Sequence, residues 1–330
     1  MFYFSVLISS FFLFILLLKN QILISDLLNI YDYPNNPRKL HKKKISLFGG
    51  IIIYFLLLNY NINLFFFKVN SLHIFNNVSF IFLSIFFFIG LLDDKYNLGS
   101  YKRFFIFIIL YFFLLKIDNK FIINQLSFSF AEKSVELGLF SIPITILCIL
   151  LFINSMNMLD GVNAVSYLTF IFFLFIIFFK LSNNFFILYL IFLIFVCLIL
   201  NIRNFLFFGS SGIYLVASII SLIITSNYKS NNLGLVNCDE VVLWLLYPGL
   251  DMLRLFFQRI YQGRDPFSSD SNHLHHYLLA KNFNVISVNF IIMFLVIMPS
   301  ILFYIFNIKF IYVFFISFLG YYLLIIYLKK

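Results

Sequence analysis

Long apolar runs, separated by short polar segments, recur along the whole chain. Most runs approach the roughly 20 residues with which an α-helix crosses a bilayer. They are continuous, without the alternation of polar and apolar positions that marks barrel strands. The pattern therefore predicts about eleven transmembrane helices. Their expected ranges are 2–18, 47–67, 74–92, 104–117, 138–156, 164–181, 185–202, 210–227, 240–253, 285–307 and 309–328.

The composition agrees with this pattern. The chain has 330 residues, of which 63% are hydrophobic and 11% charged, whereas soluble domains contain about 25% charged residues. We therefore expect an all-α, polytopic integral membrane protein in which residues 1–330 form a single membrane-embedded domain. Two of the three cysteines fall inside apolar runs and none belongs to a C-x-x-C pair, so neither a disulfide framework nor a thiolate metal site is indicated.

The basic residues predict the orientation in the membrane. With eleven spans and the N-terminus outside, the C-terminus is cytoplasmic. The cytoplasmic loops are then 19–46, 93–103, 154–163, 203–209 and 254–284. These loops and the C-terminal tail hold 16 of the 23 lysines and arginines, as the positive-inside rule requires. We therefore expect the active face on this side, and we attribute the net charge of +10 to membrane orientation and not to nucleic-acid binding.

An acidic pair, Asp93 and Asp94, ends the third apolar run in a chain with 13 acidic residues. Carboxylates are costly in a membrane and persist mainly where they pair, reach water or do chemistry. Mg²⁺ is commonly held by one or two carboxylates together with substrate phosphates. The pair is therefore a candidate magnesium or phosphate site. The alternative is a solvated helix terminus, although acids at that end oppose the helix dipole.

The first cytoplasmic loop contains Arg38, Lys39 and His41, lysines at 42–44, and a glycine pair at 49–50 where the second run begins. A basic anchor that binds anionic headgroups explains the lysines. It does not explain His41 or the glycine pair, which permits close helix approach. Substrate binding by this loop is the other interpretation.

Two more polar segments precede the middle spans. Residues 154–163 include Asn157, Asp160 and Gly161, which offer an amide for a sugar or uracil edge, a carboxylate for a metal or ribose, and a tight turn. Residues 209–212, Gly-Ser-Ser-Gly, open a later span, where backbone N–H groups favour an anion. A plain helix N-cap is the alternative for this segment.

The longest polar loop holds Arg264, Asp270 and three of the five histidines of the chain, His273, His275 and His276. His-x-His is a common zinc ligand pair, so a zinc site is one interpretation. No cysteine lies nearby in the sequence, and arginines bind phosphate groups well. A site for a diphosphate is the other interpretation.

Taken in order, these segments resemble the polyprenyl-phosphate N-acetylhexosamine-1-phosphate transferases, the membrane-type glycosyltransferase family 4. The resemblance covers about residues 25–280. The motifs that carry it are Arg38-Lys39-x-His41 with Gly49-Gly50, Asp93-Asp94 as in Asp-Asp-x-x-Asp, Asn157-Met158-x-Asp160-Gly161 as in Asn-x-x-Asp-Gly, Asp251-Met252-x-Arg254, and Pro266-Phe267-Ser268-x-Asp270-x-x-His273-Leu274-His275-His276. The histidine motif is closer to the branch that transfers N-acetylglucosamine phosphate than to the muramoyl-pentapeptide branch, which usually has three consecutive histidines.

The resemblance implies a Mg²⁺-dependent enzyme, with Mn²⁺ as the alternative ion, in the bacterial cytoplasmic (inner) membrane. It would transfer N-acetylhexosamine 1-phosphate from a UDP-sugar to undecaprenyl phosphate, releasing UMP. The lipid product would start a cell-envelope glycan such as lipopolysaccharide. The implied partners are UDP-N-acetylhexosamine, undecaprenyl phosphate and membrane lipids, with no nucleic acid, and a homodimer is compatible with this function.

The resemblance also implies roles for individual residues. The implied catalytic residues are Asp93, Asp94, Asp160, His273, His275 and His276. The implied substrate-binding residues are Arg38, Lys39, His41, Asn157, Gly161, Arg264 and Asp270. The implied metal ligands are Asp93, Asp94 and Asp160.

The sequence departs from the family pattern at three positions. Ser210 stands where the family usually has the aspartate of Gly-Asp-x-Gly-Ser, a magnesium ligand, and Asn97 and Asn163 replace further acids. Two alternatives to an active transferase therefore stay open. One is a homologue that binds UDP-sugar or lipid phosphate without turnover. The other is a lipid transporter, which is disfavoured because no inverted repeat is apparent and the charges gather at one face.

Overall fold

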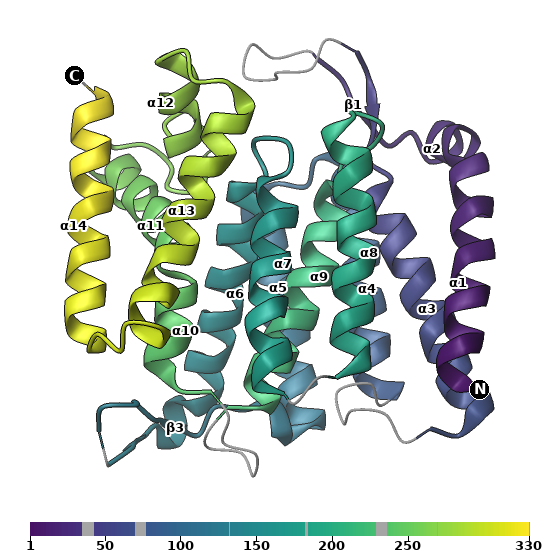
Figure 1. Ribbon diagram of the computed structural model, residues 1–330, viewed down its shortest axis with the longest axis horizontal. Helices are drawn as coiled ribbons and strands as arrows, with labels where there is room; N and C mark the ends of the chain where they lie inside the picture. Colours follow the sequence, from purple (N-terminus) through teal and green to yellow (C-terminus); the bar gives the residue numbers. More distant parts are fainter. Residues whose placement is uncertain are drawn as a thin grey trace. The chain divides into compact units, whose positions relative to one another are not determined.

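The structure is a computed structural model that describes residues 1–34, 43–69, 77–131, 133–181, 184–228, 236–268 and 270–329. Of the described residues, 76% are helical, and Figure 1 shows long helices joined by short connections. The prediction of an all-α polytopic membrane protein is therefore confirmed. The packing divides the chain into two compact units. The single domain expected from the sequence stays a prediction.

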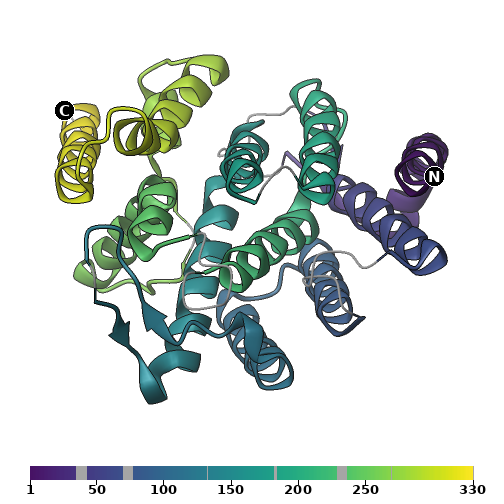
Figure 2. The same cartoon turned by 60° about the horizontal axis from the view of Figure 1, so that its bottom comes forward.

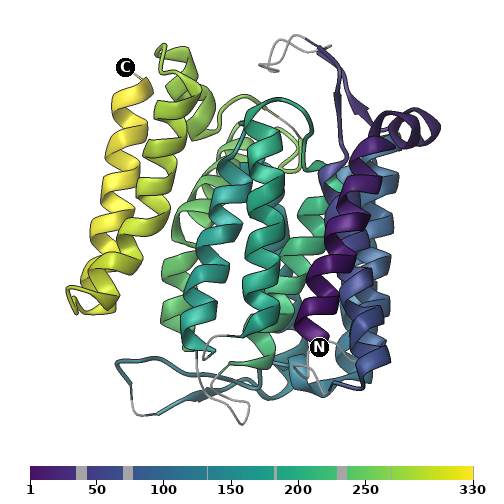
Figure 3. The same ribbon diagram turned by 45° about the vertical axis from the view of Figure 1, so that its right-hand side comes forward.

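The first unit comprises Met1–Gly99 and Phe192–Ile223. Its elements are α1 (Phe2–Lys19), α2 (Gln21–Leu28), β1 (Tyr31–Asp32), β2 (Ile45–Ser46), α3 (Gly49–Phe67), α4 (Asn77–Tyr96), the second part of α8 (Phe185–Ile202) and most of α9 (Gly209–Ser226). The strands β1 and β2 form an antiparallel pair. The antiparallel helices α1 and α3 lie side by side in Figures 1 and 3.

Polar side chains join α1 to α3 inside the apolar part of the first unit. The hydroxyl of Ser5 donates to Asn63 Oδ1 at 2.6 Å, and the Asn59 amide donates to the hydroxyls of Ser9 and Ser10 at 2.9 and 3.0 Å. In hydrocarbon such groups have no water to bond, so they pair across helices. Asn59 and Asn63 of the second apolar run therefore make interhelical contacts.

The segment between α8 and α9 is tied to the beginning of α3. The backbone N–H of Phe207 donates to Ser46 O at 2.8 Å, and the N–H groups of Gly49 and Gly50 donate to Phe207 O and Phe208 O at 2.9 and 3.0 Å. These bonds satisfy donors that the start of a helix otherwise leaves unpaired. They hold the N-terminal end of α9 beside the N-terminal end of α3.

Two glycines allow α3 and α4 to approach α9 closely. A Cβ atom on Gly50 would lie 2.3 Å from the backbone nitrogen of Gly212, and one on Gly90 would lie 2.3 Å from Cα of Ser211. No side chain fits at such distances, because backbone atoms cannot give way. Figure 2, which looks toward the helix ends, shows α3 and α4 next to α9. The start of α9 is thus packed backbone to backbone, as in small-residue membrane interfaces.

The second unit comprises Ser100–Ile191 and Ile224–Lys330. Its elements are α5 (Ser100–Ile117), a 3₁₀ turn (Asn119–Phe121), β3 (Gln125–Leu126), β4 (Val135–Glu136), a second 3₁₀ turn (Gly138–Phe140), α6 (Ser141–Leu159), α7 (Val165–Lys180), the first part of α8, the last turn of α9, α10 (Cys238–Trp244), α11 (Leu246–Tyr261), α12 (Leu274–Ala280), α13 (Val285–Tyr304) and α14 (Phe310–Lys329). The strands β3 and β4 pair antiparallel. Neighbouring helices α13 and α14 form an antiparallel pair in Figures 1 and 3.

A buried ion pair fixes one end of the second unit. Lys180 Nζ of α7 lies 2.6 Å from Glu240 Oε1 of α10, and the Tyr304 hydroxyl of α13 donates to the same oxygen at 3.0 Å. The other end collects the loop after α6, the end of α11, the short helix α12 and the starts of α5, α7 and α13 (Figure 1). Most polar segments predicted to form the active face of this unit lie at that second end.

All eleven predicted runs are helical, but their lengths differ. Eight helices in the described ranges are long and apolar enough to cross a membrane: α1, α3, α4, α6 with the turn before it, α8, α9, α13 and α14. The remaining runs correspond to α5, which carries three basic residues, to α7, which has 16 residues, and to 240–253. Length and composition thus support eight spans, and the count of eleven, with its orientation, stays a prediction.

The ninth predicted run, 240–253, is not one helix. The chain breaks at Leu245, which ends α10 and precedes α11, and α11 continues to Tyr261. The apolar run concealed this break because neither glycine nor proline stands at it; Pro248 follows within the first turn of α11, where its missing N–H is tolerated. The break starts a separate helix that carries Asp251 and Arg254.

We expect Gly90→Ala to destabilise the first unit. The added methyl group would meet the backbone of Ser211, so α4 and α9 would have to separate, at a cost of about 1–3 kcal/mol. Thermal unfolding in detergent, followed by intrinsic fluorescence, measures this change. Gly320→Ala in α14 is the matched control, because a Cβ there meets nothing within 4 Å. Equal unfolding temperatures for the two variants would contradict the close packing at Gly90.

Candidate functional site

In the first unit, Asp94 caps α9. Asp94 stands in the last turn of α4, and its Oδ1 and Oδ2 accept hydrogen bonds from the backbone N–H groups of Ser210 and Ser211 at 2.6 and 3.1 Å. Gly209 has φ +74°, a conformation that favours glycine, and a Cβ there would lie 2.7 Å from Asp94 Oδ2. The acidic pair therefore meets the segment 209–212, its neighbour in the same unit.

Asp94 lies near the ends of two helices whose dipoles act on a negative charge in opposite directions. At the end of α4 a negative charge is unfavourable, whereas at the beginning of α9 it is favourable by about 0.3–1 kcal/mol, and up to about 2 kcal/mol when partly buried. Two direct N–H···O bonds decide the balance in favour of α9, because a capping carboxylate adds about 0.5–2 kcal/mol. Asp94 is thus no ordinary solvated helix terminus.

Asp93 faces a different partner on the same helix. Its side chain is 5% exposed, and its Oδ2 accepts the hydroxyl hydrogen of Tyr214 at 2.8 Å. Tyr214 lies one turn into α9, so both members of the acidic pair contact α9 through different atoms. Sequence reasoning missed Tyr214, because nothing distinguishes it among 20 tyrosines.

The acidic pair is compatible with Mg²⁺. Carboxylate oxygens are the kind of ligand that Mg²⁺ prefers, so the donor chemistry of the pair suits this ion. Mg²⁺ is usually held by one or two carboxylates plus substrate phosphate, and a pair suffices for that arrangement. A protein-only metal cluster is a different matter: in the described ranges no three His, Cys, Asp or Glu side chains are grouped to hold a metal ion.

In the second unit, the loop after α6 meets the histidine loop. A Cβ on Gly161 would lie 2.4 Å from His275 Nε2, so the imidazole rests directly against the glycine. The sequence suggested that Gly161 permits a tight turn, but its φ is not in the left-handed region. Glycine suits the position because any larger side chain would collide with His275. Beside it, Asp160 Oδ1 accepts the hydroxyl hydrogen of Ser166 in the first turn of α7. Half-buried Asn157 lies one turn earlier in α6.

The three histidines form a compact group of rings. His273 and His275 stack with centroids 5.2 Å apart and planes 6° from parallel, and His275 and His276 are 4.3 Å apart. Burial lowers the pKa of His275 to about 3, with the neighbouring imidazoles acting in the same direction. Among the described residues, no three His, Cys, Asp or Glu side chains are grouped to hold a metal ion, so the zinc interpretation gains no support.

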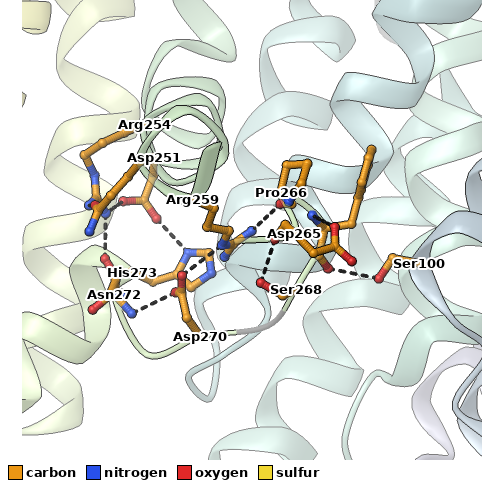
Figure 4. Close-up of polar contacts among 12 residues, drawn as sticks. Ser100, Asp251, Arg254, Arg259, Asp265, Pro266, Ser268, Asp270, Asn272 and His273 are labelled. Carbon is orange, nitrogen blue, oxygen red and sulfur yellow. Dashed lines mark hydrogen bonds and ion pairs between the residues drawn. The ribbon is translucent and has the colours of Figure 1, made fainter. Parts of the chain in front are cut away.

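His273 is held by a hydrogen-bond network centred on Asp251 of α11 (Figure 4). Its Nδ1 lies 2.9 Å from Asp251 Oδ2. Asp251 Oδ1 accepts from Arg254 Nη2 at 2.8 Å and from the Tyr321 hydroxyl at 2.7 Å. Arg254 Nη2 also donates to Asn272 O at 2.7 Å. The network joins α11, the histidine loop and α14 through buried polar groups.

The rest of the histidine loop is held by Arg259. Its Nε lies 2.8 Å from Asp270 Oδ2, and its Nη1 donates to Pro266 O at 2.9 Å (Figure 4). Partial burial opposes ionisation of Asp270, but the bonds from Arg259 and the Asn272 N–H outweigh it and lower the Asp270 pKa. The carboxylate of Asp270, which was predicted to bind substrate, is therefore hydrogen-bonded within the loop itself. Arg264 is exposed to solvent.

The start of α5 supports the same loop. The Ser100 hydroxyl donates to Phe267 O at 3.2 Å (Figure 4), and the Tyr101 hydroxyl donates to Asp265 Oδ1 at 2.8 Å. The ring of Phe267 packs against Tyr101 and Phe104, with centroids 4.8 and 5.6 Å apart. These contacts pack the histidine loop against α5 within the second unit.

The predicted site residues are distributed over the two units. Asp93, Asp94 and Ser210 belong to the first unit. Asn157, Asp160, Gly161, Arg264, Asp270, His273, His275 and His276 belong to the second. Arg38, Lys39 and His41 lie outside the described residues. The structure brings the acidic pair to Ser210, and Gly161 to His275; the roles assigned to all these residues stay predictions.

Residues 77–227 match the family described as Glycosyl transferase family 4. Over this segment the chain is similar to glycosyl transferase family 4. Together with the apolar helices, this similarity supports a membrane glycosyl-1-phosphate transferase with a lipid-phosphate acceptor and a nucleotide-sugar donor. A comparison with curated proteins gave no match.

The family match covers part of the candidate site. It includes the acidic pair, the Asn157–Gly161 motif and Ser210, whereas the histidine loop and α14 lie beyond it. The family predicted from the motifs is thereby confirmed, and the N-acetylglucosamine branch stays a prediction. The acidic pair, the Asn157–Gly161 motif and the capped start of α9 therefore all lie within the segment that is similar to the family.

Stability should depend on pH through His275. Its folded pKa of about 3 lies below the ordinary value of 6.5, so the unfolded chain binds more protons between these values. The stabilisation is complete above about pH 6.5 and is lost as the pH falls toward about 3, by at most about 1.4 kcal/mol per pH unit. Thermal unfolding in detergent between about pH 7.5 and 5 measures this slope. His275→Gln should flatten it and His276→Gln should not; equal slopes for both variants would contradict the assignment.

Proposed function

We propose that this glycosyl transferase moves N-acetylhexosamine 1-phosphate from a UDP-sugar to undecaprenyl phosphate, releasing UMP. The acceptor phosphate attacks the β-phosphorus of the donor, the bond to the UMP oxygen breaks, and a lipid-linked diphosphate sugar forms. The observation that carries the proposal is the family match over 77–227, which contains the acidic pair beside the capped end of α9. The proposed setting is the bacterial inner membrane, where the product would start a cell-envelope glycan.

Phosphoryl transfer depends mainly on positioning and on neutralising charge. Mg²⁺, when bound, would neutralise the diphosphate of the donor, and Asp93 and Asp94 of the first unit are the proposed ligands. Asp94 is held by two backbone N–H groups and Asp93 by Tyr214, so both carboxylates are positioned before substrate arrives. Such preorganisation avoids reorientation during the reaction.

The histidine loop is proposed to orient the donor diphosphate. Because Asp251 can only accept, the Nδ1 of His273 carries a hydrogen, and the ring has its Nε2 for other contacts. The neutral His275 adds no charge next to it. Arg264 is exposed and offers a guanidinium, which binds phosphate oxygens through paired N–H groups. In this proposal, Arg259 and Asp270 shape the loop.

A second candidate is a homologue that binds nucleotide sugar or lipid phosphate without turnover. The observation that favours it is Ser210, whose backbone N–H donates to Asp94 while its side chain supplies no carboxylate. One assay separates the two candidates: purified protein is incubated with undecaprenyl phosphate, Mg²⁺ and a panel of UDP-N-acetylhexosamines, and UMP is measured. Binding of UDP-sugar without release of UMP would favour the homologue that lacks turnover.

Asp94→Asn should abolish the transfer of labelled sugar phosphate to lipid in membranes containing Mg²⁺. The amide has one acceptor oxygen, so it loses charge for the cation and one of the two α9 N–H bonds. Thermal unfolding of the variant, with and without Mg²⁺, separates the two losses. A lower unfolding temperature reports the cap, and loss of the Mg²⁺-induced rise reports the ion. Transfer at the wild-type rate would remove Asp94 from the site.

Ser210→Asp should raise Mg²⁺-dependent transfer. The substitution restores, next to Asp94, the acid that the family usually has. Three neighbouring carboxylates repel one another, and a bound cation relieves this repulsion. Ser211→Asp is the matched control, because it adds the same charge one residue later, where Ser211 is buried and packed against Gly90. Unchanged transfer in Ser210→Asp would show that another group has replaced the missing acid.

A further inference from the structure

Tyr321 lies in the last helix, α14, outside the segment that matches the family, yet it contacts the centre of the histidine network. Its side chain is 1% exposed. The hydroxyl oxygen lies 2.7 Å from Arg254 Nε and 2.7 Å from Asp251 Oδ1. The ring packs edge-on against Tyr247, with centroids 6.1 Å apart. The hydroxyl is therefore placed between a cation and a carboxylate by well-packed neighbours.

The chemistry of these groups fixes the direction of every hydrogen bond. A guanidinium only donates, so the Tyr321 oxygen accepts from Arg254 Nε. The tyrosine has one hydrogen, which must then go to Asp251, because the carboxylate only accepts. For the same reason the bond between His273 and Asp251 requires a hydrogen on His273 Nδ1. The order of donation runs from Arg254 to Tyr321 to Asp251, and separately from His273 to Asp251.

The two oxygens of Asp251 have different tasks. Oδ1 accepts from Tyr321, from Arg254 Nη2 and, at 3.3 Å, from the backbone N–H of Leu274. Oδ2 faces His273. Donors on Oδ1 prevent the carboxylate from rotating, so Oδ2 stays directed at the imidazole. Tyr321 contributes the shortest of these bonds and comes from the element farthest away in the sequence.

We infer that Tyr321 is a positioning residue: through Asp251 it holds His273 with its hydrogen on Nδ1 and its Nε2 available to the proposed donor diphosphate. For that last step the inference rests on the proposed function; the coupling of Tyr321 to His273 stands on the geometry alone. The final helix thereby belongs to the functional site. Hydrogen-bond partners that orient a histidine in this way fix its tautomer and ring direction.

The first test is spectroscopic and needs no turnover. The full-length protein, labelled with ¹⁵N-histidine, contains five histidines, and His273→Gln identifies the His273 signals by their loss. In the wild type, the ¹⁵N shifts of His273 should report the tautomer with hydrogen on Nδ1. In Tyr321→Phe they should move toward a mixture of tautomers. Unchanged His273 shifts in folded Tyr321→Phe overturn the inference.

The matched control is Tyr327→Phe, which removes a hydroxyl from the same helix at a side chain that is 71% exposed. It should leave the His273 shifts as in the wild type. Tyr321→Phe keeps the ring that packs on Tyr247 and is expected to fold. If it does not, 3-fluorotyrosine introduced at position 321 changes the acidity of the hydroxyl while keeping it in place. The His273 shifts should then move, and unchanged shifts overturn the inference equally.

The second test measures UMP release from a UDP-N-acetylhexosamine in the presence of undecaprenyl phosphate and Mg²⁺. We expect Tyr321→Phe to lower kcat about tenfold. In an Asp251→Asn background the same substitution should cause no further loss, because Tyr321 acts through Asp251. Full additivity of the two losses, or a wild-type kcat in Tyr321→Phe, overturns the inference. If the wild type releases no UMP, the proposed function fails, and the ¹⁵N shifts alone decide whether Tyr321 positions His273.

Discussion

A carboxyl group surrounded by apolar helices must be met by hydrogen-bond partners, and this requirement organises both units. An unpaired charge in such surroundings is far more costly than any single packing contact. Asp94 is met by the backbone N–H groups of α9, and Asp251 by a histidine, an arginine and a tyrosine. At the other end of the second unit, Glu240 is met by Lys180 and Tyr304. Each carboxylate therefore joins helices that the apolar pattern alone would leave free to slide.

The sequence predicted the helices well because apolar length is a local property. Every expected run is helical, and the acidic pair lies within one helical turn of the end of α4, close to where the pattern ended the span. The break at Leu245 escaped prediction because α10 and α11 together read as one apolar run. Likewise, the division into two units could not be predicted, since it depends on contacts between segments as distant as residues 99 and 192.

The site was predictable where its chemistry follows from charged residues in short motifs. Asp251 and Arg254 are three positions apart on one helix, and that spacing is visible in the sequence and present as an ion pair. Tyr321 and Tyr214 left no such signal, because a tyrosine in an apolar run resembles any other aromatic residue. Gly161 was singled out for a turn but serves the approach of His275, a contact over more than 100 residues of chain. Functional roles of the predicted site residues await the substitutions described above.

The cap on α9 has a mechanical consequence. Asp94, in the last turn of α4, accepts hydrogen bonds from two successive backbone N–H groups of α9. One turn earlier in α4, Gly90 packs directly against the backbone of Ser211. Moving α9 along its axis by one residue, about 1.5 Å, would break both amide bonds and drive a side chain into that contact. Piston motion between these two helices is thereby blocked. The described contacts therefore couple α4 to the first turns of α9 along the helix axes.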